Sequence, residues 1–234
     1  MSQSRPSPDL VVARYREPVA WLRKVPRSIR VFLYDKGGDL APADVPGAEI
    51  TRLANVGREA HTYLTHIVRH YASLSPLNVF CQGKPFDHVP EFHRVLRELA
   101  AGTPVPGGFR WLGFIVDTDD PRGRRLFVPW SKNPDRRELA LDRFHLELFG
   151  SPCPERVRFF PGANFIASRE RIRSRPLDFY QKALLLAEAF PDAAHCFERV
   201  WDEIFGIAGV DEALLSGRDT AYLRPVKRIT RATS

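Results

Sequence analysis

The segment Asn55–Tyr71, NVGREAHTYLTHIVRHY, brings together side chains that could bind an anion or move a proton. A helical pattern of apolar residues begins directly after Gly57. Backbone N–H groups at a helix start attract anions, and an arginine strengthens such a site. We therefore expect Gly57, Arg58, Glu59 and His61 to border a ligand site. The alternative for Arg58 and Glu59 is a solvated first helical turn.

Two further histidines, His66 and His70, lie on the same helical segment. Their spacing of four residues places them on one side of a helix, as in some metal-binding pairs. However, they lie far from the helix start, and the sequence does not place a third ligand beside them. We therefore do not expect His66 and His70 to hold a metal.

The segment Cys81–His88, CQGKPFDH, follows an apolar run that is typical of a buried strand. Asp87 and His88 are natural metal ligands or acid–base groups, and Gln82 can both donate and accept hydrogen bonds. Gly83 would let a ligand approach the backbone closely. A plain turn is the alternative interpretation of this segment.

Acidic residues also occur later in the chain. The run Asp117–Asp120, DTDD, contains an Asp-x-Asp pattern that can share a divalent cation with a diphosphate. The pattern is common by chance, so we interpret the run as a solvated turn. Glu198 lies in a helical segment and is a candidate base or ligand, whereas Trp201 fits a core position.

The elements predicted along the chain alternate between strands and helices. Strands are predicted over 9–15, 29–38, 77–83 and 111–120, with two short ones within 156–172; helices are predicted over 17–25, 58–71, 90–101, 137–150, 176–190 and 195–206. This alternation favours an α/β domain with a mostly parallel central sheet flanked by helices.

Ligands of such sheets bind at the carboxyl ends of the strands. The residues at three predicted strand ends are polar, charged or glycine: Arg14, Tyr15, Arg16 and Glu17 after the first, Asp35 and Lys36 at the second, and Gln82 and Gly83 at the third. We expect these residues to form the ligand site together with the start of the helix at Arg58.

Length and composition are those of one globular domain: 234 residues, 44% hydrophobic and 27% charged. We expect a disordered N-terminus (1–8), one domain (9–224) and a basic tail (225–234). No apolar run is long enough to span a bilayer, and no signal-peptide pattern is present, so a cytoplasmic location is expected. The three scattered cysteines predict buried free thiols.

The net charge of +7 fits an anionic partner. Nucleic acid is not the expected partner, because the sequence has no aromatic RNA-binding motif, Cys/His finger or long basic block. The glycine-rich loops of dinucleotide-binding and P-loop proteins, the serine nucleophile elbow and the His-Glu-x-x-His motif are also missing. Common dehydrogenases, P-loop enzymes, serine hydrolases and zincins are therefore not favoured.

Several motifs together resemble a family of domains of unknown function: LVVARYRE, LYDKG, NVGREAHTYLTHIV, FCQGKPFDH, PGANFIASRERI and ERVW. The resemblance spans roughly residues 10–205 and carries no established activity. The order of elements is also remotely similar to GT-A type glycosyltransferases.

The GT-A resemblance implies that residues 12–17 border a nucleotide, with Asp35 and Lys36 beside it, and that residues 82–88 take the place of the metal motif. It also implies that residues 164–169 and Glu198 face the acceptor. CQGKPFDH departs from the Asp-x-Asp of that group, so the metal would be held differently or be absent, or the fold would serve another purpose.

These observations lead to one main hypothesis and two alternatives. The main hypothesis is a glycosyltransferase-like enzyme that uses a nucleotide-sugar donor and an unknown acceptor, with Asp87, His88 or Glu198 in acid–base roles. Asp87 and His88 would also hold a divalent metal, Mn²⁺ or Mg²⁺, if one binds. The alternatives are a metal-dependent hydrolase built from Glu59, His61, Asp87 and His88, and a non-catalytic module that binds an anionic partner.

Overall fold

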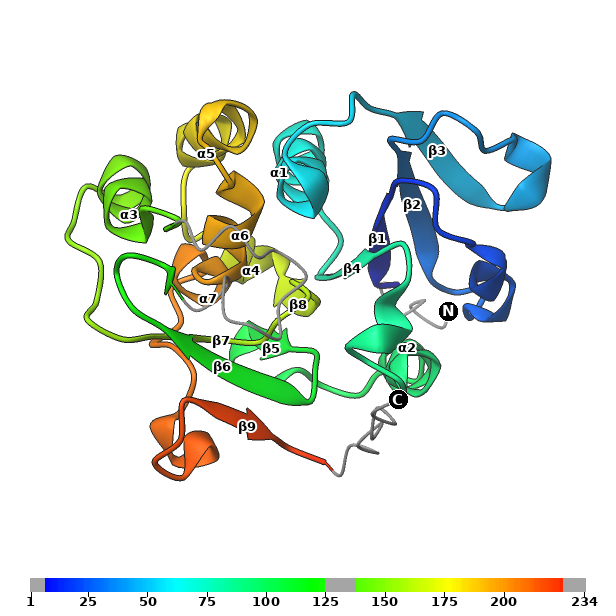
Figure 1. Cartoon of the computed structure of the whole chain (residues 1–234). Helices are drawn as coiled ribbons and strands as arrows, with labels where there is room; N and C mark the ends of the chain where they lie inside the picture. Colours follow the sequence, from blue (N-terminus) through cyan, green and yellow to red (C-terminus); the bar gives the residue numbers. More distant parts are fainter. Residues whose placement is uncertain (1–6, 125–137, 225–234) are drawn as a thin grey trace, which may run out of the picture.

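Two β-sheets organise the protein, whose computed structural model describes residues 7–124 and 138–224 (Figure 1). The larger sheet has six strands in the order β3-β2-β1-β4-β8-β5. They are β1 (Asp9–Arg14), β2 (Arg30–Asp35), β3 (Ala48–Arg52), β4 (Leu77–Gln82), β5 (Phe109–Trp111) and β8 (Phe165–Ser168). Strands β1 to β4 pair in parallel, whereas β8 runs antiparallel to both of its neighbours. The smaller sheet is antiparallel, in the order β7 (Val157–Phe159), β6 (Ile115–Asp119), β9 (Thr220–Tyr222).

The helices complete a single α/β domain. They are α1 (Arg58–His70), α2 (Phe92–Ala100), α3 (Leu141–Phe149), α4 (Arg169–Ile172), α5 (Leu177–Ala189), α6 (Ala193–Glu198) and α7 (Trp201–Ile204). Short 3₁₀ helices cover Ala20–Lys24, Pro42–Asp44, Pro85–Asp87, Pro106–Gly108 and Glu212–Leu215. The mostly parallel sheet flanked by helices confirms the predicted fold class.

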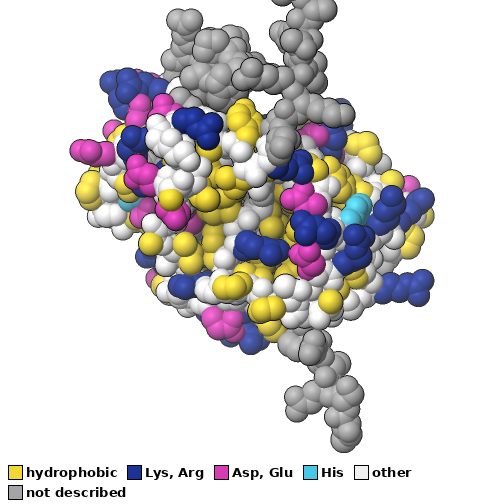
Figure 2. Space-filling model, turned by 90° about the horizontal axis from the view of Figure 1, so that it is seen from below, with side chains coloured by type: hydrophobic (Ala, Val, Ile, Leu, Met, Phe, Trp, Pro, Cys, Tyr) yellow, Lys and Arg dark blue, Asp and Glu magenta, His cyan; other side chains and the backbone are white. Residues whose placement is uncertain are grey.

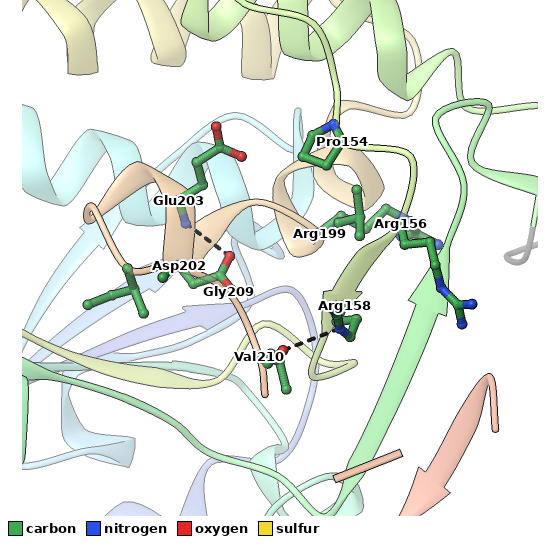
Figure 3. A pocket seen from close by; sticks show the side chains of 11 residues that line it. Pro154, Arg156, Arg158, Arg199, Asp202, Glu203, Gly209 and Val210 are labelled. Atoms are coloured by element: carbon green, nitrogen blue, oxygen red, sulfur yellow. Dashed lines mark hydrogen bonds between the residues drawn. The ribbon is translucent and has the colours of Figure 1, made fainter. Parts of the chain in front are cut away.

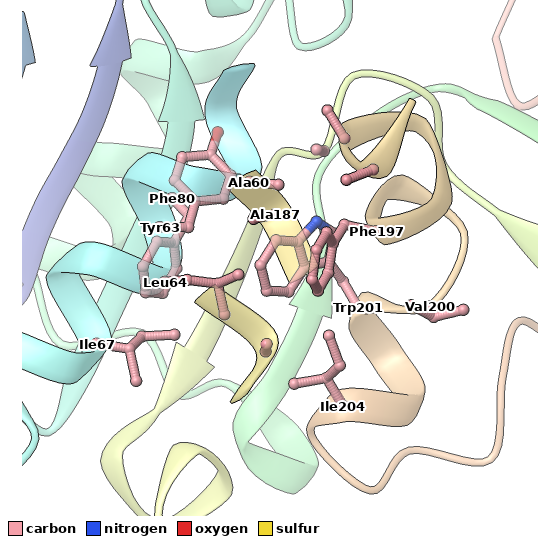
Figure 4. Close-up of a cluster of buried hydrophobic side chains, with 14 of the residues drawn as sticks. Ala60, Tyr63, Leu64, Ile67, Phe80, Ala187, Phe197, Val200, Trp201 and Ile204 are labelled. Atoms are coloured by element: carbon pink, nitrogen blue, oxygen red, sulfur yellow. The ribbon is translucent and has the colours of Figure 1, made fainter. Parts of the chain in front are cut away.

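Alternation along the strands directs side chains into two separate cores. Val11 of β1 packs in the core under α1, α5 and α6, whereas its neighbour Val12 packs in the core under α2. In the first core, Tyr63 of α1 lies between Phe80 of β4 and Trp201 of α7 (Figure 4). Trp201 is fully buried, which confirms its predicted core position.

The parallel register brings the carboxyl ends of three strands level with one another. Arg14 at the end of β1 is opposite Asp35 of β2, and Ala13 is opposite Gln82 of β4. The start of α1 follows β3 and returns to this same edge, where Lys36 contacts the carbonyl oxygens of Val56 and Arg58. The fold thus collects the polar strand ends and the helix start in one place.

Several predicted elements differ from the structure. The segment at 17–25 is a 3₁₀ helix rather than an α-helix, and the loop predicted after Gly38 contains strand β3. The strand predicted over 111–120 is divided between β5 of the large sheet and β6 of the small one. The helix predicted over 195–206 is two short helices, α6 and α7, because the chain turns at Arg199 and Val200.

Other expectations concern the chain ends, the cysteines and the membrane. The predicted disordered N-terminus (1–8) lies outside the described residues except for residues 7 and 8. The predicted basic tail (225–234) lies wholly outside them. Cys81, Cys153 and Cys196 are free thiols; Cys81 and Cys196 are buried and Cys153 is half-buried. Across residues 7–124 and 138–224, none of the helices has the length and apolar character needed to cross a bilayer.

Candidate functional site

Two adjoining cavities lie at the carboxyl ends of the parallel strands, and we call them together the cleft. The first, of about 400 Å³, is lined by Ala13, Arg14, Tyr15, Glu17, Lys36, Asn55, Arg58, Glu59 and Gln82. The second, of about 240 Å³, is lined by Arg58, Glu59, Gln82, His88, Asp117, Phe159, Pro161, Gly162, His195, Glu198 and Arg199. Arg58, Glu59 and Gln82 belong to both linings, so they mark the junction of the two cavities.

Arg14 forms part of the first cavity at the end of β1. Its Nη1 donates to Asp35 Oδ1 at 2.7 Å and to Asp39 Oδ1 at 2.8 Å. Asp35 is buried and does not line the cleft; it holds the arginine in place instead. A charge-assisted pair of this kind fixes the direction of a guanidinium. The predicted site residue Asp35 therefore has a positioning role in the structure.

Lys36 supplies a second positive charge in the first cavity. It is buried, and its Nζ donates to the carbonyl oxygens of Val56 and Arg58, both at 2.5 Å. Burial lowers the pKa of Lys36 to about 8. The ammonium group is thus fixed between the end of β2 and the start of α1.

The start of α1 has an unusual backbone. Gly57 and Arg58 both lie in the left-handed region, with φ of 57° and 47°. A Cβ on Gly57 would lie 2.4 Å from the carbonyl oxygen of Ala187, so glycine is required here. A non-glycine residue in this region, as at Arg58, is uncommon and is often found at functional sites.

The structure separates the predicted residues of this helix start. The exposed Arg58 reaches across the cleft, where its Nη1 lies 3.0 Å from His195 Nε2 on α6. His61 is buried and turns instead to α5, where its Nε2 lies 3.0 Å from Glu188 Oε1. Arg58 and Glu59 therefore line the cleft, whereas His61 lines neither cavity.

Glu59 has the pKa expected of a proton-transfer group. It is half-buried at the junction of the two cavities. Burial, followed by the negative charge of Glu198, raises the pKa of Glu59 to about 7. A carboxyl group with this pKa can both give and take a proton near neutral pH.

Glu198 faces the same cavity from the end of α6. Its Oε1 accepts a short hydrogen bond from the backbone N–H of Gly162. Gly162 has a φ of 98°, and a Cβ there would lie 2.5 Å from the ring of His88. The turn at Gly162 therefore lets Glu198 and His88 approach each other, and both line the second cavity.

The acidic run on β6 is not the solvated turn that we expected. Asp117, Thr118 and Asp119 are all buried. Asp117 lines the second cavity and accepts a hydrogen bond from Thr220 Oγ1 at 2.7 Å. Asp119 Oδ2 lies 2.7 Å from both Nε and Nη2 of the buried Arg199. Only Asp120 belongs to a turn, where it accepts backbone hydrogen bonds from Arg122 and Gly123.

Asp87 and His88 do not form a joint site. Asp87 is exposed, pairs with Lys84 at 3.1 Å and lines neither cavity, whereas His88 lines the second cavity. Within residues 7–124 and 138–224, no group of three or more His, Cys, Asp or Glu side chains is arranged to hold a metal ion. The predicted metal ligands Asp87 and His88 therefore do not fit a metal centre.

The remaining predicted residues form or support the wall of the first cavity. Tyr15 and Glu17 line it, and Glu17 Oε2 accepts from the backbone N–H of Tyr15 at 2.7 Å. Arg16 stacks over the Tyr15 ring outside the lining. The carbonyl oxygen of Gly83 accepts from the indole N–H of Trp21 at 2.8 Å, which fixes the end of β4.

Sequence reasoning missed several residues of the cleft: Asn55, Phe159, Pro161, Gly162, His195 and Arg199. A signal existed for His195, because it precedes Glu198 by three residues and a helix places such residues on one face. No comparable signal existed for Phe159, because its place beside Asp117 depends on the pairing of β7 with β6, which are distant in the sequence.

Comparison with known proteins assigns a family. Among curated proteins, none matches the chain. A family model described as "Protein of unknown function (DUF3431)" matches residues 10–213. The matched range includes every residue that lines the cleft. The chain therefore belongs to the DUF3431 family.

Proposed function

We propose that this protein is a glycosyltransferase-like enzyme that binds a nucleotide-sugar in the cleft and transfers the sugar to an acceptor. The observation that carries the proposal is the position of Glu59. Its carboxyl group, with a pKa of about 7, stands between a cavity that holds fixed cations and a cavity that holds further carboxyl groups. A transfer reaction from a diphosphate donor needs these two environments side by side.

The first cavity suits the diphosphate of the donor. Arg14, Lys36 and Arg58 are positively charged side chains in its lining. Positive groups held in fixed positions stabilise the negative charge that develops on a leaving diphosphate. The exposed Tyr15 ring at the rim offers a surface on which a nucleobase can stack.

The second cavity suits the sugar and the acceptor. Glu59, Asp117 and Glu198 line it, and carboxylates accept hydrogen bonds from sugar hydroxyl groups. In the proposed reaction, Glu59 or Glu198 takes the proton from the attacking hydroxyl group as the new bond forms. Burial, together with the nearby charge of Glu198, keeps the pKa of Glu59 high enough for this role.

No step of the proposed reaction uses a metal ion. Asp87 and His88 do not converge, and Asp119 is engaged by Arg199. Lys36 and Arg58 carry the positive charge that the leaving group requires. The resemblance to GT-A enzymes implies that residues 12–17 border the nucleotide. Four of these residues, at and just after the end of β1, line the first cavity, which supports the proposal in this respect.

A thermal-shift panel of nucleotides and nucleotide-sugars, each with and without manganese, tests the proposal. A ligand that binds only the folded state raises the melting temperature. We expect one class of nucleoside diphosphate and its sugar derivatives to raise the melting temperature of the wild-type protein. A panel in which no nucleotide shifts the transition of well-folded protein contradicts the proposal. Stabilisation by manganese alone favours a metal-dependent hydrolase instead.

A further inference from the structure

A third cavity, of about 390 Å³, lies beyond Arg199 and shares only that residue with the cleft (Figure 3). It is lined by Pro154, Arg156, Val157, Arg158, Arg199, Asp202, Glu203, Ile207, Ala208, Gly209 and Val210. The side chain of Arg199 is buried and engaged by Asp119, and it is the one residue shared by the linings of the third cavity and the cleft. The third cavity is therefore a separate place for a ligand.

The acidic groups of this cavity are compensated within the fold. Glu203 lies 2.9 Å from Nε2 of the buried His145. Asp202 is buried, and burial raises its pKa to about 7. Its carboxyl group is therefore protonated in a large fraction of the molecules near neutral pH. These two residues therefore place little uncompensated negative charge in the cavity.

The positive charges of Arg156 and Arg158, which also line this cavity, are paired with exposed carboxylates. Arg156 pairs with Asp219 at 3.3 Å and Arg158 pairs with Glu212 at 3.1 Å; the side chains of these partners are 61% and 66% exposed. Exposed pairs of this kind contribute little free energy, because water and salt screen them. A more highly charged anion can take their place at little cost.

We infer that the third cavity binds a small phosphomonoester with hydroxyl groups on its organic part. Arg156 and Arg158 are two residues apart on an extended segment, roughly 7 Å along the chain, so both guanidinium groups can reach one phosphate. Hydrogen bonds from the hydroxyl groups go to the half-buried Glu203 carboxylate. Ile207 provides an apolar contact for the carbon skeleton.

Calorimetric titration with glycerol 3-phosphate tests this inference. The test variant is the double substitution Arg156→Gln and Arg158→Gln, at an exposed and a half-buried position. The matched control is Arg94→Gln with Arg122→Gln, which removes the same charge from arginines that pair with Glu98 and Glu138 elsewhere. A third variant, Arg58→Gln, removes a cation from the cleft.

We expect the wild type, the matched control and Arg58→Gln to bind glycerol 3-phosphate with similar affinity, and the test variant to bind at least about tenfold more weakly. Glycerol alone should not bind, and inorganic phosphate should bind more weakly than the ester. The inference is overturned if the wild type does not bind, or if the test variant binds as tightly as the control. Loss of binding in Arg58→Gln also overturns it, because the ligand would then occupy the cleft. The inference does not depend on the glycosyltransferase proposal, which a different ligand panel tests.

Discussion

At the scale of single residues, Glu59 carries most of the chemistry that we propose. Its pKa is raised from 4.5 to about 7 by burial and by Glu198. The folded protein therefore holds the Glu59 proton more tightly than the unfolded chain does. By linkage, this group contributes stability below pH 4.5, and that contribution is lost as the pH rises through 7.

The first prediction follows from this linkage. The substitution Glu59→Gln should remove the loss of stability between pH 5 and 8, which is at most about 3 kcal/mol. Urea unfolding of the wild type and the variant at both pH values measures it. Glu147→Gln on the exposed face of α3 is the control. Parallel pH dependences in wild type and Glu59→Gln would contradict the assigned pKa.

The second prediction concerns the cations of the first cavity. Arg58→Ala should weaken binding of the nucleotide identified by thermal shift about tenfold or more, because a charge-assisted contact to phosphate is lost. The side chain is exposed, so the free energy of unfolding should change little. Titration calorimetry together with urea unfolding separates these two effects. Unchanged nucleotide affinity in a folded Arg58→Ala protein would remove Arg58 from the site.

At the scale of elements, the start of α1 is the feature that shapes the cleft. The third prediction is that Gly57→Ala destabilises the protein by about 2–4 kcal/mol, since it adds a contact with the Ala187 carbonyl to the strain of a left-handed backbone. Gly47 also has a positive φ, but a Cβ there would meet nothing within 4 Å. Gly47→Ala should therefore show only the backbone cost, about 1–2 kcal/mol.

Denaturant unfolding of the two alanine variants checks this prediction directly. Equal losses of stability in Gly57→Ala and Gly47→Ala would mean that the contact between α1 and α5 does not restrict position 57. The difference between the variants is more informative than either value, because both share the entropy change of replacing glycine.

The elements also show how far the sequence can predict this site. Strands β1, β2 and β4 and helix α1 follow from apolar runs and helical periodicity, and their register explains why Arg14, Lys36 and Gln82 meet. Strand β3 was missed because it lies at the sheet edge, where its residues are half-buried or exposed and show no clear alternation.

The acidic run on β6 was interpreted wrongly for a different reason. Asp117 and Asp119 are buried because Thr220 and Arg199 contact them. These partners lie far away in the sequence, and local patterns contain no information about such contacts. The same limit applies to His61, whose partner Glu188 is also distant in the sequence, whereas Asp87 pairs with the nearby Lys84.

At the scale of the whole molecule, the described surface can be compared with the cleft in how charged side chains are arranged. On the face seen in Figure 2, Lys and Arg side chains are interspersed with acidic and hydrophobic ones rather than forming one continuous basic surface. The net charge of +7 comes from residues outside 7–124 and 138–224, because the described residues contain as many acidic as basic side chains. Within the cleft, Arg14, Lys36 and Arg58 line a single cavity together with Glu17 and Glu59.

The fourth prediction concerns the pH dependence of the free energy of unfolding, to which the buried His66 contributes. Its Nδ1 lies 3.0 Å from the Tyr34 hydroxyl group, and burial followed by the charge of His70 lowers its pKa to about 3. The unfolded chain therefore takes up a proton at a higher pH than the folded protein. Stability is unaffected by this group above pH 6.5 and is lost as the pH falls from 6.5 towards 3.

His66→Asn should flatten this acid dependence, because asparagine keeps an acceptor near Tyr34 and cannot be protonated. The loss of unfolding free energy between pH 7 and 4.5 should be smaller in the variant than in the wild type by about 2 kcal/mol. Urea titrations at the two pH values give these differences. An acid dependence that is the same in both proteins would show that His66 does not set it.

The central claim is that the cleft transfers a sugar with Glu59 and Glu198 in the proton-transfer roles. The most direct test is the release of nucleoside diphosphate from the nucleotide-sugar that stabilises the protein, with water as the acceptor of the sugar, measured in wild type, Glu59→Gln and Glu198→Gln. The account predicts release by the wild type and a loss of roughly a hundredfold or more in kcat in at least one variant, with donor affinity retained. Release at the wild-type rate by both variants, or no release by a wild type that binds the donor, would contradict it.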